Sequence, residues 1–131
     1  METNIVINGE EISKCKINRD TENSGRWIIS SWFTLDKYQH QGYGKAVLKE
    51  ALEKMMAEYG SPTTIEYIWN GVNQYVFDWL NKFDAVCKES LAVAKNECND
   101  TWDAHIYILN SSKVLEYAGL MPQLTLENFD L

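Results

Sequence analysis

The chain has 131 residues, of which 45% are hydrophobic and 24% are charged. This is the profile of one ordinary globular domain, and a domain of this size buries about two-thirds of the surface of its unfolded chain, so it needs no disulfides. The 12 lysine and arginine residues against 19 aspartate and glutamate residues give a formal net charge of -7. This charge argues against nucleic-acid binding through bulk electrostatics, because the phosphate backbone would be repelled.

The cysteine and histidine content limits the redox and metal chemistry. Cys15, Cys87 and Cys98 are an odd number with no C-x-x-C pair, which is typical of reduced thiols, so we expect a cytoplasmic protein. The amino-terminal residues lack the basic segment and apolar run of a leader, and no run of about 18 apolar residues would cross a membrane. His40 and His105 are too few and too separated in sequence to form a metal site, so no metal is predicted.

Residues 1–35 predict a β-hairpin followed by a central strand. A turn at residues 8–10 separates two segments in which polar and apolar residues alternate, as they do along a half-buried strand. A polar stretch over residues 18–25 then leads to residues 26–35, which are almost continuously apolar or β-branched. That composition favours a central strand covered on both faces.

Residues 37–83 predict a turn, a helix, a strand and a second helix. From Ala46 the apolar residues recur with the i, i+3, i+4, i+7 spacing of an amphipathic helix, which ends at Gly60. Residues 63–69 form a short β-rich segment, and residues 72–83 repeat the helical spacing. A strand, a helix and a further strand in this order imply that the two strands pair in parallel.

Residues 85–109 predict an antiparallel hairpin with a long polar loop at residues 95–101. Residues 112–119 are expected to form one or two helical turns, and residues 121–131 form an irregular tail. No repeat, low-complexity tract or linker interrupts residues 1–131. The sequence therefore predicts a single α/β domain in which a mixed sheet is flanked by helices.

A glycine-containing turn lies between the central strand and the first helix. Its residues are Gln39, His40, Gln41, Gly42, Tyr43, Gly44 and Lys45. Glycine lets the backbone approach a ligand closely, and a helix N-terminus offers unpaired N–H groups and the positive end of the helix dipole. A phosphate or pyrophosphate fits this geometry; a tight turn with glycines for packing alone is the alternative. The turn is not a Walker loop, because it lacks the pattern G-x-x-x-x-G-K-[ST], and it is not a dinucleotide fingerprint, because the third glycine is absent.

The segment Gln39-x-x-Gly42-x-Gly44 resembles the Q/R-x-x-G-x-G/A signature of the GCN5-related N-acetyltransferase (GNAT) family. A looser match is residues 73–85, which are similar to the family segment N-x-x-A-I-x-F-Y-x-x-x-G-F. The resemblance covers about residues 27–109. It implies a mixed sheet that splays into a V between the two parallel strands, with acetyl-coenzyme A lying in the notch.

The resemblance also implies which residues contact the coenzyme. Backbone amides of residues 41–45 would hold the pyrophosphate, and the edge of residues 33–35 would pair with the pantetheine arm. In all, it assigns coenzyme contacts to Phe33, Thr34, Leu35, Gln39, His40, Gln41, Gly42, Tyr43, Gly44, Lys45, Asn73, Phe77 and Leu80. An acidic chain is compatible with this ligand, because helix N-termini bind anions without many cationic side chains.

Two features depart from the family pattern. Leu80 occupies the position where the family usually has a tyrosine that protonates the departing thiolate, and leucine cannot donate a proton. Residues 1–26 predict a hairpin, whereas the family normally has a strand and two helices in this region. The side of the site where the acetyl acceptor binds would then lack its usual wall. It could be open to an amine on a protein, or a second subunit of a homodimer could supply the wall. The third alternative is that the protein has no acceptor.

Candidates for acid and base chemistry lie near the expected splay. Glu66 on the second parallel strand is a candidate general base, and Ser31 or Thr34 is a candidate for holding a water that serves as base. Tyr75, in the second helix, is a candidate proton donor. No sequence context separates these residues from ordinary strand or helix residues.

The sequence is compatible with two main functions. The first is an N-acetyltransferase that moves acetyl from acetyl-coenzyme A to an amine, and the acidic surface favours a cationic acceptor such as a protein lysine, an N-terminus or a polyamine. The second is a catalytically inactive GNAT-like binding or inhibitor module, such as a phage or mobile-element accessory protein, which Leu80 favours. A structural protein, in which the glycine turn binds nothing, is a third reading.

Overall fold

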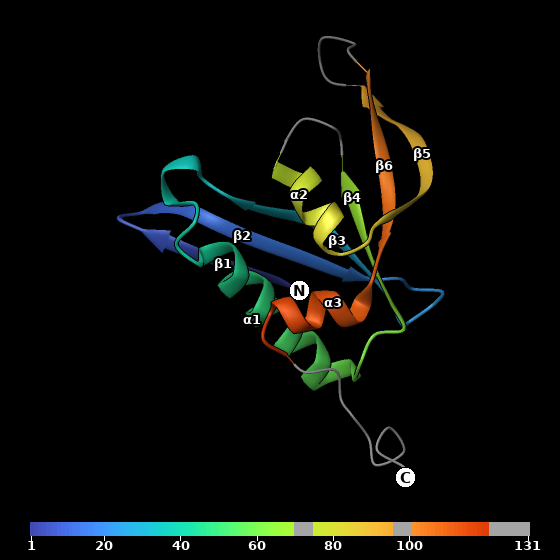
Figure 1. Cartoon of the computed structure of the whole chain (residues 1–131), viewed down its shortest axis with the longest axis horizontal. Helices are drawn as coiled ribbons and strands as arrows, with labels where there is room; N and C mark the ends of the chain where they lie inside the picture. The colour runs from blue at the N-terminus through green and yellow to red at the C-terminus, as the bar shows by residue number, and fades with distance from the viewer. Residues whose placement is uncertain (70–74, 96–100, 121–131) are drawn as a thin grey trace.

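The computed structural model describes residues 1–69, 75–95 and 101–120, which form one sheet and its covering helices (Figure 1). The strands are β1 (Glu2–Ile7), β2 (Glu10–Arg19), β3 (Arg26–Thr34), β4 (Thr64–Trp69), β5 (Val86–Lys95) and β6 (Thr101–Leu109). The helices are α1 (Tyr43–Tyr59), α2 (Tyr75–Lys82) and α3 (Ser111–Tyr117), with a short 3-10 helix η1 (Asp36–Tyr38) before α1. The predicted irregular tail, residues 121–131, lies outside the described residues.

The six strands are ordered β1-β2-β3-β4-β6-β5. The β1–β2, β2–β3, β4–β6 and β5–β6 pairs are antiparallel, whereas β3 and β4 pair in parallel. The mixed sheet, both hairpins and the parallel pair that the sequence predicts are therefore confirmed. The described helices do not include one with the length and apolar character needed to cross a membrane.

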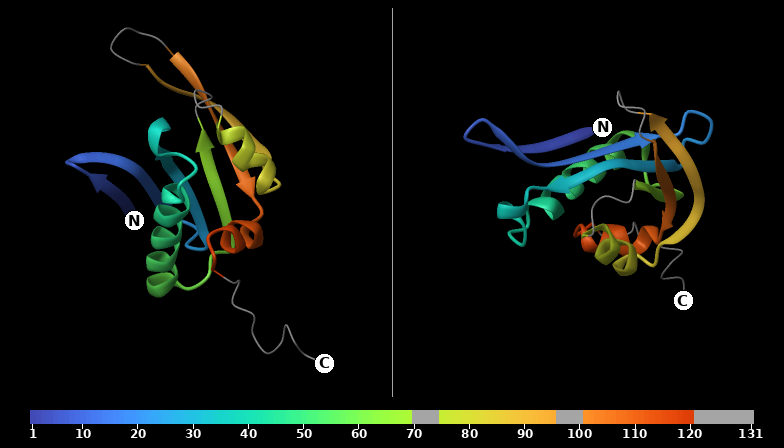
Figure 2. Two further views of the ribbon diagram at one scale, coloured as in Figure 1. Left: turned by 60° about the vertical axis from the view of Figure 1, so that its left-hand side comes forward. Right: turned by 90° about the horizontal axis from the view of Figure 1, so that it is seen from above.

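All three α-helices lie on the same side of the sheet (Figure 2). Along β3 the side chains of Trp27, Ile29 and Trp32 are buried beneath these helices, whereas Ile28 is half-buried and Ser30 is exposed. The prediction that the central strand is covered on both faces is therefore wrong. An apolar run marks a strand that packs well, but it does not reveal whether the second face has a covering layer.

Helix α1 packs along β1, β2 and β3. Its buried residues follow the predicted helical spacing and are Val47, Leu48, Ala51, Leu52 and Met55. Thr3 in β1 donates its hydroxyl proton to the carbonyl of Val47 at 2.6 Å, which ties the first strand to the helix. The helix ends at Gly60, whose φ of 80° is accessible to glycine at little cost.

Helix α3 follows β6 and closes the core beside α1. The Asn110 side chain accepts a hydrogen bond from the Lys113 backbone N–H at 3.1 Å and so caps the helix. Val114 and Leu115 are buried in the same core cluster as residues of α1. The helical turns that the sequence predicts at residues 112–119 are therefore confirmed, and they place the C-terminal end of α3 beside α1 and α2 (Figure 1).

The parallel strands β3 and β4 separate before either one ends. Their pairing runs from Arg26 and Thr64 to Ile29 and Tyr67. Beyond that point β3 continues to Thr34 without a β4 partner, while its other edge stays paired with β2. The sheet thus splays between the two parallel strands, as the family resemblance implied, and the turn before α1 lies at the open end.

Candidate functional site

The turn that precedes α1 is held by its own side chains. Gln39 donates its amide to the carbonyl of Thr34 at 3.0 Å and to the Asp36 carboxylate at 3.3 Å. His40 and Gly42 adopt left-handed backbone angles, with φ of 63° and 86°. The motif glutamine therefore fixes the path of the chain from β3 into α1.

The two glycines of the turn have different roles. A Cβ atom at Gly44 would lie 3.1 Å from the Thr34 hydroxyl, so this glycine allows α1 to approach β3 closely. A Cβ atom at Gly42 would meet no atom within 4 Å. The described side chains do not cap the N-terminus of α1 either. The beginning of this helix thus combines uncapped N–H groups with open space, as anion-binding helix termini do.

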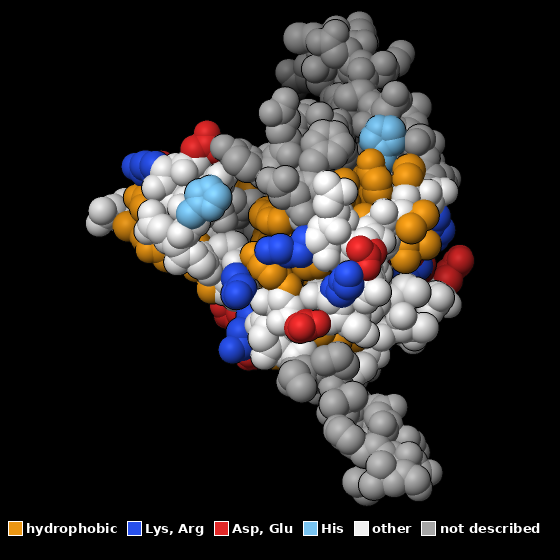
Figure 3. All heavy atoms as spheres, in the orientation of Figure 1, with side chains coloured by type: hydrophobic (Ala, Val, Ile, Leu, Met, Phe, Trp, Pro, Cys, Tyr) orange, Lys and Arg blue, Asp and Glu red, His pale blue; other side chains and the backbone are white. Residues whose placement is uncertain are grey.

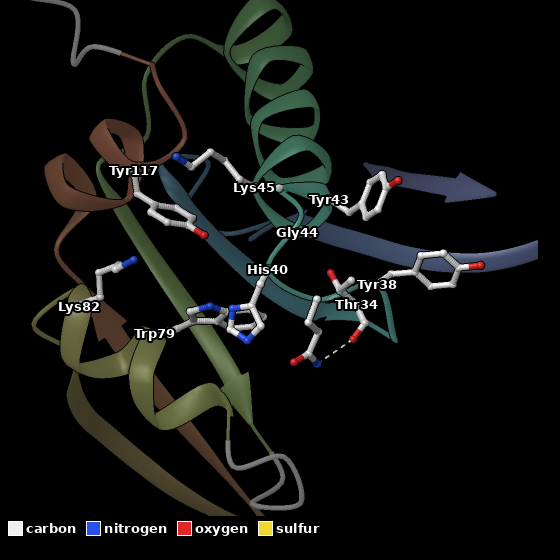
Figure 4. Close-up of a pocket in the computed structure, with 11 residues that line it drawn as sticks. Thr34, Tyr38, His40, Tyr43, Gly44, Lys45, Trp79, Lys82 and Tyr117 are labelled. Atoms are coloured by element: carbon white, nitrogen blue, oxygen red, sulfur yellow. Dashed lines mark hydrogen bonds between the residues drawn. The ribbon is translucent and has the colours of Figure 1, made fainter. Parts of the chain in front are cut away.

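A pocket of about 320 Å³ lies at this turn, between α1, α2 and α3 (Figure 4). Its lining residues are Thr34, Tyr38, Gln39, His40, Gly42, Tyr43, Gly44, Lys45, Trp79, Lys82 and Tyr117. On this face of the molecule, lysine or arginine side chains gather around an apolar hollow (Figure 3). A pocket of this size with mixed lining is typical of a small-molecule site.

Trp79 of the pocket lining stacks on Trp32, which is buried in the core behind it. Trp32 of β3 and Trp79 of α2 have ring centroids 3.8 Å apart and planes inclined by 18°. The Trp32 indole N–H also donates a hydrogen bond to the carbonyl of Gly44 at 2.9 Å. One buried indole therefore fixes both the start of α1 and the position of α2.

Most residues that the resemblance assigned to the coenzyme turn do line the pocket: Thr34, Gln39, His40, Gly42, Tyr43, Gly44 and Lys45. Phe33, Leu35 and Gln41 are not in the lining, although Gln41 belongs to the same turn and donates to the Lys37 carbonyl at 3.4 Å. Leu80 is 7% exposed and belongs to the hydrophobic core. Asn73 lies outside the described residues, as do the side chains of Phe77 and Tyr75.

Sequence reasoning missed four residues of the lining, Tyr38, Trp79, Lys82 and Tyr117. Lys82 follows Trp79 by three positions, so both fall on one face of α2, and this spacing is a signal that was available. Tyr117 gave no such signal, because it comes from α3, far away in the sequence. Burial raises the pKa of the Tyr117 hydroxyl above its ordinary value, so this group stays protonated at neutral pH.

Glu66 does not fit the role of general base that we considered for it. Its carboxylate is 2% exposed and accepts hydrogen bonds from Arg26 Nε at 2.6 Å and Arg26 Nη2 at 2.8 Å. The Lys88 ammonium lies 3.6 Å away. The Arg26 hydrogen bonds, with the charges of Arg26 and Lys88, hold the pKa of Glu66 below its ordinary value, which weakens it as a base.

The position of Glu66 leads to the same correction. Glu66 pairs with Ile28 in β3, on the face of the sheet opposite the buried Trp27 and Ile29. The pocket lies on the helix-covered face, and its lining does not include Glu66. Ser31 is half-buried and is also absent from the pocket lining. Its neighbour in the chain, Trp32, is the residue whose side chain points to the helices.

The model of the acetyltransferase (GNAT) family matches residues 5–76, which is more than half of the chain. No curated protein matches the sequence. The match includes most of the hairpin, the splayed strand β3, the glycine turn and the whole of α1.

Solved structures share the fold at low sequence identity. The ribosomal-protein-S18-alanine N-acetyltransferase from Escherichia coli is 14% identical, with a TM-score of 0.57 over 83% of this chain and 67% of its own. An N-acetyltransferase from Staphylococcus aureus Mu50 is 13% identical, with a TM-score of 0.60 over 84% and 67%. A ribosomal-protein-alanine N-acetyltransferase from Brucella melitensis is 9% identical, with a TM-score of 0.58 over 82% and 66%.

The chain spans about two thirds of the length of these proteins. At such identities the likeness shows the fold, and the family model adds the sequence pattern of the turn and the helix that follows it. The splayed mixed sheet, the glycine turn at its open end and the matching family model lead to one assignment: this chain belongs to the acetyltransferase (GNAT) family.

Proposed function

We propose that this protein is an N-acetyltransferase that uses acetyl-coenzyme A as its acetyl donor. The observation that carries the proposal is the uncapped N-terminus of α1 at Gly42, where open space lies above a glycine with a φ of 86°. The pyrophosphate of the coenzyme would accept hydrogen bonds from the N–H groups of residues 42–45. The family generally uses this donor, and the described residues present a pocket that fits its anionic part.

The pantetheine arm would follow the edge of β3 beyond Ile29, where pairing with β4 has ended. A strand edge offers N–H and C=O groups at regular intervals, which suit the two amides of pantetheine. The thioester would then lie close to the point where the two strands separate. Thr34 is the pocket-lining residue at the outer end of this path.

The reaction would be direct attack of an amine nitrogen on the thioester carbonyl carbon. The C–N bond forms and the C–S bond breaks, the amine loses a proton, and the coenzyme thiolate gains one. The net charge of -7 favours a cationic acceptor such as a protein lysine, an N-terminus or a polyamine. Leu80, at the position of the family's usual proton-donating tyrosine, offers no hydroxyl to the departing thiolate.

Two measurements test the proposal in order. Isothermal titration of the full chain with acetyl-coenzyme A should give saturable one-to-one binding in the micromolar range; no heat at high micromolar ligand would refute coenzyme binding. A thiol-release assay with protein, peptide and polyamine amines should then show acetyl transfer. The control reaction omits the amine, because slow hydrolysis of the thioester also releases thiol.

One observation favours the second candidate, a GNAT-like binding module without catalysis. Leu80 lies in the hydrophobic core at the position where the family usually has its proton-donating tyrosine. Glu66, the carboxylate that we considered as base, is held by Arg26. Tight acetyl-coenzyme A binding without turnover on any amine would support this second function and refute the first.

A further inference from the structure

The pocket contains a second position that suits an anion, opposite the turn. Lys45 of α1 and Lys82 of α2 extend toward the same side chain, Tyr117 of α3 (Figure 4). The Lys45 Nζ atom lies 5.0 Å and the Lys82 Nζ atom 4.5 Å from the centroid of the Tyr117 ring. Two ammonium groups from different helices therefore converge at one end of the pocket.

Neither of these lysines is neutralised by a carboxylate in the described part of the chain. Seven of the described cationic side chains form ion pairs, Lys14, Arg26, Lys37, Lys49, Lys54, Lys88 and Lys113, whereas Lys16 and Arg19, outside the pocket, do not. Lys45 and Lys82 make no such pair with any described residue. Two uncompensated cations that line one pocket raise the local concentration of anions there.

Tyr117 is held in place and can take part in anion binding. Its ring packs edge-on against Phe83, with centroids 5.4 Å apart, and against Trp32 at 6.3 Å. Its hydroxyl has no hydrogen-bond partner among the described residues and extends into the pocket (Figure 4). A phenol and two ammonium groups form a set of hydrogen-bond donors that suits a dianionic phosphomonoester.

The lysine pair and the turn offer two separate anion positions. The turn binds through backbone N–H groups at the start of α1, whereas the Lys45 side chain extends away from that turn toward α3 (Figure 4). A ligand that fills both positions needs two phosphate groups joined by a spacer. Coenzyme A has this form, because its ribose carries a 3′-phosphate in addition to the pyrophosphate.

We propose that Lys45, Lys82 and Tyr117 bind the ribose 3′-phosphate, so that this chain selects acetyl-coenzyme A over its 3′-dephospho form. The inference rests on the proposed function, since it assigns the second anion position to the same coenzyme. Lys82 and Tyr117 are then specificity-determining residues that lie outside the glycine turn. The selectivity is electrostatic and falls as ionic strength rises.

Calorimetric titration of the wild-type chain with acetyl-coenzyme A and with acetyl-3′-dephospho-coenzyme A tests the inference. We expect the dephospho form to bind at least about tenfold more weakly, since charge-assisted contacts to a phosphate are among the stronger hydrogen bonds. Lys82→Gln and Lys45→Gln should each weaken acetyl-coenzyme A binding about three- to tenfold and leave binding of the dephospho form nearly unchanged. Lys54→Gln, with the same charge change on the exposed side of α1, is the matched control and should change neither.

The outcomes separate this inference from the proposed function. Equal binding of the two coenzymes by the wild-type chain would overturn the inference while the proposed function stands. No binding of either coenzyme would overturn both. If the lysine variants lose affinity for both coenzymes equally, the inference is also overturned, because the lysines would then contact another part of the ligand. Thermal melts verify folding; if one lysine variant does not fold, the wild-type comparison and the other variant decide.

Discussion

The indole rings of Trp32 and Trp79 stack with their centroids 3.8 Å apart, across the gap where β3 and β4 diverge. Trp32 lies in the part of β3 that has lost its β4 partner, and Trp79 lies in α2, which follows β4. The stack thus joins the two halves of the splayed sheet. Because the Trp32 indole also binds the Gly44 carbonyl, the geometry of the glycine turn depends on this pair.

Replacing Trp79 should therefore affect both stability and the site. We expect Trp79→Ala to lower the free energy of unfolding by about 2–3 kcal/mol, because it removes a large, partly buried aromatic side chain and its stacking. Trp79→Phe, which keeps an aromatic ring, should cost about 1 kcal/mol. Urea denaturation measures the two free energies.

The far-ultraviolet circular dichroism of coupled indoles gives an independent readout of the same pair. The wild-type chain should show an exciton signal, and Trp79→Phe should lack it while the protein stays folded. A signal that persists in Trp79→Phe would mean that it arises from other tryptophans. The same unfolding free energy for the wild type and Trp79→Ala would contradict the structural role of the stack.

Gly42 and Gly60, at the two ends of α1, allow a test of the turn. Both have positive φ, 86° and 80°, and a Cβ atom would contact nothing at either site. An alanine in the left-handed region of Gly42 costs about 1 kcal/mol, whereas Gly60→Ala should cost more, because its ψ of -164° lies in a region that is essentially restricted to glycine. Only Gly42 lines the pocket, so Gly42→Ala alone should weaken acetyl-coenzyme A binding, by about tenfold. If the two variants bind acetyl-coenzyme A with the same affinity, the coenzyme does not bind at this turn.

The elements of the fold could be predicted because their signals are local. Alternation marks the hairpins, helical spacing marks α1, and the order of strand, helix and strand fixes the parallel pair. Asp84 shows the limit of such signals, because its residue type does not indicate the left-handed backbone that it adopts. It stands where the family segment has glycine, yet it adopts a glycine-like φ of 50°, with the Lys113 ammonium 2.6 Å from its carboxylate.

The candidate site was predicted in part, and the missing part depends on tertiary contacts. The glycine turn is contiguous in sequence, so its residues could be found by a motif. Tyr117 reaches the same pocket from α3, and no local pattern records that approach. Glu66 was a candidate base because it is a carboxylate on the second parallel strand, near the splay. Its pairing with Arg26 could not be foreseen, since Arg26 lies 40 residues earlier in the chain and is a neighbour only through the parallel pairing of β3 and β4.

Glu66→Gln tests the buried ion pairs. The pKa of Glu66 lies below its ordinary value because Arg26 donates hydrogen bonds to the ionised form. The resulting stabilisation is fully present above the pKa of an unfolded glutamate, about 4.3, and is lost as the pH falls through the lower pKa of the folded state. At neutral pH we expect Glu66→Gln to lower the free energy of unfolding by about 2 kcal/mol.

The pH dependence separates this effect from a general loss of packing. Between about pH 5 and pH 3 the wild-type free energy of unfolding should fall more steeply than that of Glu66→Gln, because the variant lacks the carboxylate that is protonated in this range. Glu53→Gln, which removes an exposed partner of Lys49, is the control and should cost less than about 0.5 kcal/mol. If the free energy of unfolding of the wild type and of Glu66→Gln depends on pH in the same way, the lowered pKa of Glu66 is contradicted.

Cys15 provides a probe of coenzyme binding that does not require catalysis. The residue is 0% exposed, and burial raises the pKa of its thiol to about 12, so almost no thiolate exists at pH 8. Iodoacetamide should therefore modify Cys15 quickly in urea and only through transient opening in the native protein. Because a ligand that binds the native state suppresses opening, saturating acetyl-coenzyme A should slow this labelling further. Peptide mapping by mass spectrometry measures the labelling of Cys15. The same labelling rate in native and denatured protein would contradict the burial of this residue.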